Sequence, residues 1–387
     1  MRRLGVMWSG ATVLVAALGC DGAGANSHVA DVDVAETAKG NDPDGAGPDV
    51  AHDEVGAEDF EIAPEGEVTS ESDVTPESDT TPDIDVSIGY CQGAVVEMTQ
   101  VHGLPYVMVG VDGTEGYFLV DWGTTATAID PTGFNPYFPE PLAGSSDRWD
   151  GFSFFGPWGT VRMSQQDFSW FDGPIRQAGI LGTDFLALNA FVVDWDAGTL
   201  ARAEPGAGCT DAALLEAGMR PLSTAGYYAR DLDEVFAGMP NIPTIPARVG
   251  AAQAPAQIDT GYDDALVGPA ININHAFRAA IADASLVRAP ELDLVLTTCV
   301  PGLVESVDAW RLAIGATLEL VGEDDNAVRS YSDAILFEKD TPAAAFRCGG
   351  IGTWATPGAQ LGVSFVARGG RAVFDPVRSR VWLPRDP

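Results

Sequence analysis

The stretch YFLVDWGTTATAIDP, residues 117–131, combines an apolar run, an Asp-x-Gly turn and a second apolar pair that is followed closely by proline. Residues 256–269, AQIDTGYDDALVGP, repeat this order. Ten residues separate Asp121 from Pro131, and ten separate Asp259 from Pro269. Self-similarity with conserved spacing inside one chain indicates two copies of one structural unit.

The two units also end alike. GILGTDFL (179–186) is followed by FVVD (191–194), and QLGVSFV (360–366) is followed by AVFD (372–375). Strand-like periodicity without long amphipathic runs predicts a mainly β chain. Short helices are expected at residues 211–218 and 275–284, where apolar residues recur at helical spacing. Roughly 300 residues are enough for two lobes with cores of their own, and we predict them at 89–209 and 210–387.

These elements resemble the aspartic peptidases, in both the pepsin and the retropepsin branches, over residues 91–387. The resemblance rests on Asp121-Trp122-Gly123, on Asp259-Thr260-Gly261 and on two downstream triplets. Ile180-Leu181-Gly182 fits the family's apolar-apolar-Gly triplet, whereas Gln360-Leu361-Gly362 fits it in the last two positions. The resemblance implies an all-β, bilobal, pepsin-like or retropepsin-like fold with two pseudo-symmetric lobes, each donating one aspartate to a shared cleft.

The same resemblance implies a peptidase chemistry. Two carboxyl groups close together share one proton, so that one activates water and the other polarises the peptide carbonyl. Asp121 and Asp259 are therefore the expected catalytic pair of an aspartic endopeptidase that acts on peptides or proteins. This mechanism needs no metal and no organic cofactor. Gly123 and Gly261 are expected to let each loop turn tightly and approach the cleft.

The supporting residues depart from the family pattern. The family has Thr or Ser directly after each aspartate, where this chain has Thr260 in the second unit but Trp122 in the first. It also commonly has Ser or Thr three residues after each aspartate, where Thr124 fits and Tyr262 does not. The alternative function is therefore a catalytically inactive relative that binds peptides or proteins, or serves as a structural surface module.

Residues 150–164, DGFSFFGPWGTVRMS, contain two alternating runs around Gly-Pro-Trp-Gly. This pattern predicts a β-hairpin. Its place in the first unit matches the flap that closes over substrate in the aspartic peptidases. Trp158, at the expected tip, is a candidate substrate-binding residue. The alternative is an aromatic side chain that is buried or faces a partner protein.

The N-terminus predicts export. A Met-Arg-Arg start, an apolar run over residues 6–18 and a small residue before Cys20 are typical of a secretory signal. ALGC, residues 17–20, resembles the bacterial lipobox, which implies a signal peptide over residues 1–20 and lipidation of Cys20. Lipid chains would hold the protein on a cell-envelope membrane, periplasmic or outer-surface, without spanning it. The alternative is an ordinary signal peptide that is cut nearby.

Residues 21–88 are acidic and contain one Phe, no Trp and no Tyr. Such a segment cannot bury enough apolar surface to offset chain entropy, so we expect a disordered linker. The whole chain has a net charge of −35, which argues against nucleic-acid binding because phosphate contacts need a basic face. Two lobes in one chain complete the aspartate pair without a second subunit, so we expect a monomer.

The cysteines predict disulfides. Besides Cys20 the chain has four, and an even number outside the cytoplasm suggests two bridges. Of the three possible pairings, the predicted lobes favour Cys91–Cys209 and Cys299–Cys348. No cysteine pair has zinc-site spacing, and the four histidines are scattered, which leaves little for a metal site or a Ser-His-Asp triad.

Overall fold

A computed structural model describes residues 91–134, 148–169, 173–204, 209–224 and 242–386. The predicted signal segment, Cys20 and the linker over residues 21–88 lie outside these ranges. Within them, no helix has the length and apolar character required to span a membrane.

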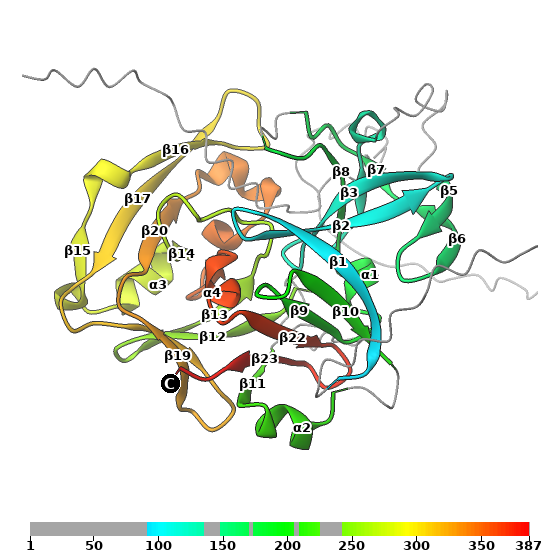
Figure 1. Ribbon diagram of the computed structural model, residues 1–387. Coiled ribbons are helices and arrows are strands. Elements are labelled where there is room, and N and C mark those ends of the chain that lie inside the picture. Colours follow the sequence, from blue (N-terminus) through cyan, green and yellow to red (C-terminus); the bar gives the residue numbers. More distant parts are fainter. Residues whose placement is uncertain (1–90, 135–147, 170–172, 205–208, 225–241, 387) are drawn as a thin grey trace, which may run out of the picture. The chain divides into compact units, whose positions relative to one another are not determined.

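The predicted mainly β class is confirmed, and the described strands form two large sheets (Figure 1). The first sheet contains β1 (Gly93–Val101), β2 (Leu104–Val111), β3 (Thr114–Val120), β4 (Ala128–Ile129), β5 (Arg148–Ser153), β6 (Pro157–Arg162), β7 (Ser164–Gln165), β8 (Gln177–Leu181), β9 (Phe191–Asp194), β10 (Thr199–Ala203), β11 (Met219–Ser223), β22 (Arg371–Asp375) and β23 (Arg380–Pro384). The second contains β12 (Thr244–Val249), β13 (Ala252–Ile258), β14 (Ala270–Asn274), β15 (Leu286–Arg288), β16 (Leu294–Thr297), β17 (Val304–Leu312), β18 (Leu318–Val321), β19 (Ala327–Tyr331), β20 (Ile335–Asp340) and β21 (Ala359–Leu361).

The described helices are short. The α-helices are α1 (Thr183–Leu186), α2 (Asp211–Glu216), α3 (His275–Ala280) and α4 (Ser364–Ala367), and the 3-10 turns are η1 (Pro131–Gly133), η2 (Asp283–Ser285), η3 (Pro290–Leu292), η4 (Ala343–Cys348) and η5 (Ile351–Thr353). Helices α2 and α3 confirm the two predicted helices but end earlier. Thr210 and Asn274 begin them by accepting a backbone N–H with the side chain.

The internal repeat appears as the same strand arrangement in both sheets. In the first, β8 is parallel to β3 and antiparallel to β4. In the second, β21 is parallel to β13 and antiparallel to β14. In each case the strand that carries the downstream triplet lies between the strand that precedes the aspartate and the strand that follows the aspartate loop. The two loops therefore have equivalent surroundings.

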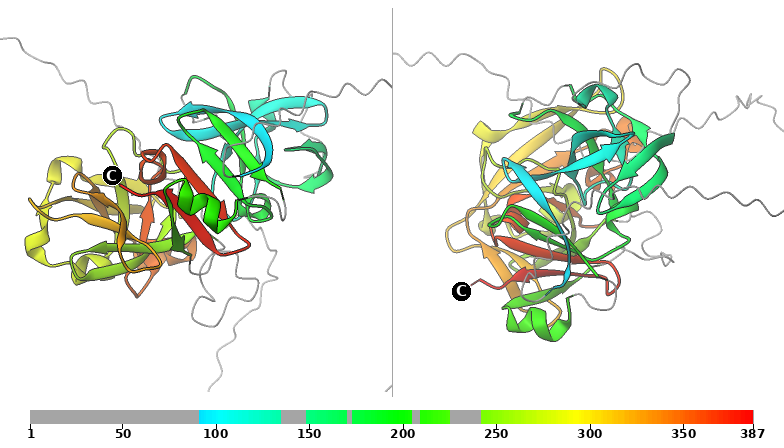
Figure 2. Two further views of the ribbon diagram at one scale, coloured as in Figure 1. Left: turned by 60° about the horizontal axis from the view of Figure 1, so that its bottom comes forward. Right: turned by 45° about the vertical axis from the view of Figure 1, so that its right-hand side comes forward.

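Strands from the end of the chain complete the first sheet. Its order β11-β23-β22-β9-β10-β1 joins the hairpin β22–β23 to the hairpin β9–β10 (Figures 1 and 2). Across this junction, Phe374 pairs with Phe191. The two strands at the junction, β9 and β22, are buried along nearly all of their length. Backbone pairing thus crosses the sequence division that we placed at 209/210. We call the part of the first sheet formed by β11, β23, β22, β9, β10 and β1 the shared sheet, because it connects the two repeated units.

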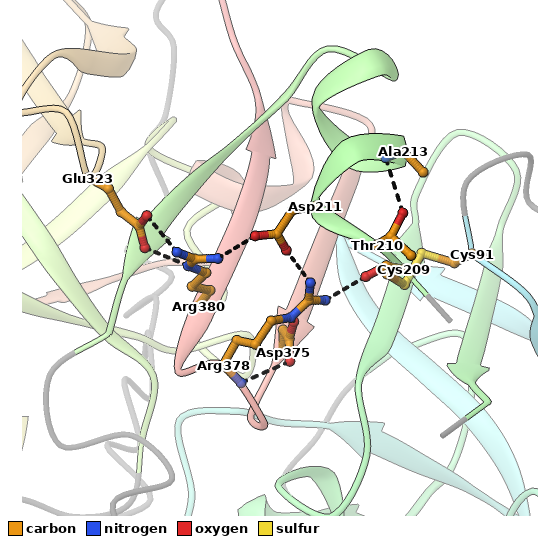
Figure 3. Close-up of polar contacts among 9 residues, drawn as sticks. All are labelled: Cys91, Cys209, Thr210, Asp211, Ala213, Glu323, Asp375, Arg378 and Arg380. Carbon is orange, nitrogen blue, oxygen red and sulfur yellow. Dashed lines mark hydrogen bonds and ion pairs between the residues drawn. A yellow bond between two sulfur atoms is a disulfide. The ribbon is translucent and has the colours of Figure 1, made fainter. Parts of the chain in front are cut away.

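A disulfide lies at one end of the shared sheet. Cys91, just before β1, is bonded to Cys209, just before α2, which confirms the first predicted pair (Figure 3). Cys299 is also disulfide-bonded. The side chain of its predicted partner, Cys348, lies outside the described part of the structure.

Two arginines beside this disulfide, in the β22–β23 segment, form ion pairs with α2. Arg378, in the β22–β23 turn, contacts Asp211, Asp375 and the backbone oxygen of Cys209 (Figure 3). Arg380 bridges Asp211 at 2.8 Å and Glu323, which lies beyond β18, at 2.6 Å. The network therefore connects segments from both repeated units at one edge of the shared sheet.

Candidate active site

The two aspartates are held identically by the backbone. The N–H of Asp121 donates to the carbonyl oxygen of Leu181, and the N–H of Asp259 donates to that of Leu361, each at 3.0 Å. Leu181 and Leu361 are the middle residues of the two triplets. The triplets therefore fix the point at which each aspartate leaves its strand.

The structure brings the two carboxyl groups together. Gly261 N donates to Oδ1 of Asp259 at 2.9 Å and to Oδ1 of Asp121 at 3.1 Å, so one backbone donor serves both loops. Gly123 N donates to Oδ1 of Asp121 at 2.6 Å. Both carboxyl groups are buried, with 1% exposure at Asp121 and 2% at Asp259.

The two glycines are needed for space rather than for an unusual backbone conformation. A Cβ atom on Gly123 would lie 2.4 Å from the carboxyl carbon of Asp259, and one on Gly261 would lie 2.5 Å from Oδ2 of Asp121. Neither glycine has a positive φ, so the expected tight turn is not the reason for them. Each glycine instead makes room for the aspartate of the opposite loop.

One hydroxyl joins the loops. Thr260 Oγ1 accepts from the N–H of Trp122 at 3.0 Å and donates to the carbonyl oxygen of Val120 at 2.8 Å. Within the described ranges, the hydroxyl of Thr124, which was expected to support Asp121, makes only a long contact of 3.4 Å with the carbonyl oxygen of Ala126. The first loop therefore lacks the reciprocal hydroxyl, because Trp122 stands in its place.

Trp122 packs away from the carboxyl groups. Its buried ring stacks on Phe374 of β22 with 3.8 Å between centroids, and its edge faces Phe191 of β9. Its indole N–H has no hydrogen-bond partner among the described residues. The side chain thus belongs to the core beneath the shared sheet, which explains how the loop accommodates a residue much larger than threonine.

Tyr262 is also a core residue. It packs in a cluster that includes Ile335 and Phe337, and burial raises the pKa of its hydroxyl well above the usual value. A side-chain donor to Asp259 comes instead from Gln360, whose Nε2 lies 2.7 Å from Oδ2 of the carboxylate. Sequence reasoning missed this contact, although the polar residue at the first position of an otherwise apolar triplet was its signal.

Burial dominates the electrostatics of Asp121. Loss of hydration raises its pKa to about 6, while hydrogen bonds from Gly123, Asp259 and Gly261 act in the opposite direction. The two carboxyl groups interact directly, so they titrate as a pair. Two buried carboxyl groups that interact directly disfavour simultaneous ionisation and so favour sharing one proton.

The predicted hairpin is present, but its turn and Trp158 differ from the expectation. The turn contains Phe155 and Gly156, both with positive φ, so Trp158 is the second residue of β6 and not the tip. Its ring meets Phe185 edge-to-face at 5.0 Å, and its Nε1 donates to the carbonyl oxygen of Phe154. Trp158 is therefore half-buried and packs onto the first unit, and its role in substrate binding stays a prediction.

Comparison with solved structures finds similar chains, among them an aspartic proteinase. The chain resembles the aspartic proteinase from Irpex lacteus, with 12% identity, over 76% of this chain and 97% of that chain, at a TM-score of 0.36. No family model and no curated protein matches the sequence. The pepsin-like, two-lobed β fold is evident from the chain's own repeated loops and shared sheet.

Proposed function

We propose that this protein is an aspartic endopeptidase whose catalytic pair is Asp121 and Asp259. The observation that supports this most directly is the single N–H of Gly261, which donates to a carboxyl oxygen of each aspartate. Two carboxyl groups held on one donor are close enough to share a proton, which is the requirement for activating water without a metal.

In the proposed reaction, the ionised carboxyl of the pair takes a proton from water as the oxygen attacks the peptide carbonyl carbon. The protonated carboxyl donates a hydrogen bond to the carbonyl oxygen and stabilises the developing charge. The proton then passes to the leaving amine as the C–N bond breaks. The buried setting of the pair strengthens these interactions because water does not screen them.

The test is cleavage of an unfolded protein by the full chain between pH 3 and pH 7. We expect activity at acidic or mildly acidic pH and its loss in Asp121→Asn and in Asp259→Asn, since either change removes the shared proton. Cleavage that survives both substitutions would refute the proposed pair. A folded protein with no activity at any pH would favour the inactive, peptide-binding relative.

We further propose that Cys20 carries lipid and tethers the enzyme to a cell-envelope membrane, where it acts as a monomer on peptide or protein substrates. The support is the sequence of residues 1–20 alone. Mass spectrometry of the N-terminal peptide should find an acylated Cys20, and Cys20→Ser should release the protein from the membrane fraction. An unmodified N-terminus at another residue would contradict the tether.

A further inference from the structure

A chain of buried amides leads to Asp259. Asn272 Nδ2 donates to Oε1 of Gln360 at 3.0 Å, and Gln360 Nε2 donates to Oδ2 of Asp259 at 2.7 Å. Asn272 is 3% exposed and Gln360 is 8% exposed. Because Asn272 engages the oxygen of the Gln360 amide, the nitrogen of that amide is left to face the carboxylate.

The first unit has no such chain. Asn272 and Gln360 are paired across β14 and β21, and the corresponding pair across β4 and β8 is Ala128 and Ile180. Both of these are apolar and buried. Burying a polar pair costs free energy unless its members are hydrogen-bonded. The pair lies beside only one of the two equivalent aspartates, which indicates that its hydrogen bond to Asp259 has a specific role.

We propose that Gln360 is a positioning residue, oriented by Asn272, that fixes the Asp259 carboxyl and favours its ionised form. Its amide takes the place of the Ser or Thr hydroxyl that the family pattern has at the position of Tyr262. A hydrogen bond to a charged group is stronger than one between neutral groups, and a donor to the ionised form stabilises that form. The inference deepens the proposed function, in which Asp259 is half of the catalytic pair.

Three further carboxyl groups belong to the two aspartate loops around Asp259. Asp121 faces it from the end of β3, and Asp263 and Asp264 follow it on its own loop. Tyr262 is neutral because its pKa is raised. These carboxyl groups all disfavour a negative charge on Asp259, so the neutral Gln360 donor acts against them. His102 Nδ1 lies 2.8 Å from Oδ2 of Asp263, within hydrogen-bonding distance.

The decisive measurement is a titration of the aspartate carboxyl carbons in the full chain by ¹³C NMR, with Asp259→Asn used to assign the pair. In Gln360→Met, which keeps the length of the side chain but removes the donor, the lower apparent pKa of the pair should rise by about one unit or more. Gln360→Glu should raise it further, because it adds a negative charge. Asn272→Leu should raise it less.

The acidic limb of the kcat/KM profile should move with this pKa, while KM changes little. Gln177→Leu is the matched control, because Gln177 is a buried amide at the start of β8 whose Oε1 accepts from Tyr106. It should leave both the titration and the acidic limb unchanged.

An unchanged lower pKa in folded Gln360→Met and Gln360→Glu would overturn the positioning role even if the enzyme cleaves. An increase in cleavage rate in Gln360→Met would also overturn the positioning role, since Gln360 would then hinder the reaction. Absence of cleavage in the unsubstituted protein would instead count against the proposed function, and the titration would still decide the role of Gln360.

Discussion

Gly123 and Gly261 show how tightly the two aspartate loops are fitted to each other. Each lies where a methyl group would overlap the aspartate of the opposite loop. The overlap involves a carboxyl group that is itself held by hydrogen bonds, so it cannot move without loss of those bonds. The side-chain space between the loops is therefore already full.

Gly123→Ala should consequently displace Asp259. We expect the cleavage rate to fall by roughly 100-fold or more, because a displacement of about 1 Å at a catalytic group has effects of this size. Gly218→Ala is the control, since Gly218 has a φ of 83° with open space around its Cα. It should cost stability, about 1 kcal/mol, but leave the rate unchanged. Equal rates in the two variants would contradict the close fit.

The pKa of Asp121 predicts a pH dependence of stability. Its folded-state pKa of about 6 lies above the ordinary value of 3.8, so the folded protein binds the proton more tightly than the unfolded chain. The stabilisation is complete below about pH 4 and is lost as pH rises through about 6. A shift of this size is worth on the order of 3 kcal/mol.

Urea unfolding between pH 4 and pH 7 measures this effect. The free energy of unfolding should fall over that interval, and Asp121→Asn should fall less because its amide does not titrate. Part of the fall should persist in the variant, since burial also raises the pKa of Asp264 to about 6. A free energy that rises with pH in the unsubstituted protein would contradict the assignment.

At the scale of the loops and helices, each aspartate loop is hydrogen-bonded to the helix that follows its triplet. The carboxylate of this contact lies on the helix in the first unit and on the loop in the second. In the first unit, Thr127 on the loop donates its N–H and its hydroxyl to Asp184 of α1. In the second, Asp264 on the loop accepts the N–H and the hydroxyl of Ser364 in α4. The same carboxylate–hydroxyl contact thus holds both loops.

Thr260 performs a different task, because its hydroxyl links the two loops to each other. Thr260→Val should leave the N–H of Trp122 and the carbonyl oxygen of Val120 without their partner, at a cost of about 1–3 kcal/mol for each buried group. We expect a lower unfolding free energy and slower cleavage together.

Thr244→Val is the matched control. Thr244 is equally buried, but its hydroxyl donates to the carbonyl oxygen of Ile242 within the second unit. This variant should lose about 1 kcal/mol of stability and keep its cleavage rate. A loss of activity as large as that of Thr260→Val would mean that the inter-loop bond has no special part in the site.

At the scale of the whole folded unit, the shared sheet and the Cys91–Cys209 disulfide both join segments that are distant in sequence. The disulfide closes a loop with a sequence separation of 118 residues. Restricting so long a loop in the unfolded chain stabilises the folded state by about 4–5 kcal/mol in the chain-entropy description. The double variant Cys91→Ala, Cys209→Ala should lower the unfolding free energy by about this amount, as measured by urea denaturation.

Asp211→Asn supplies the comparison, because it weakens the neighbouring arginine contacts without opening the disulfide. Asp211 is half exposed, so its ion pairs should contribute little, about 1 kcal/mol or less. A larger loss from Asp211→Asn than from the double cysteine variant would reverse this ranking of the two connections.

The sequence by itself determined the fold class and the position of each motif. Spacing between motifs is a property of the chain, and alternating apolar residues select strands whatever their partners. For this reason the two Asp-x-Gly loops, the triplets and helices α2 and α3 could be predicted, whereas the four-residue helices α1 and α4 were missed. The Cys91–Cys209 pair followed because each predicted unit held two of the four remaining cysteines.

Only the tertiary structure decided what each side chain contacts. Trp122 is accommodated because Phe374, more than 250 residues later, provides a face to stack on. Gln360 reaches Asp259 because β21 lies beside β13. Trp158 lies within a strand and not at the tip of the hairpin, because the turn forms three residues earlier, at Phe155. Such contacts depend on which strands become neighbours and on the space left between them, and neither is a local property of the sequence.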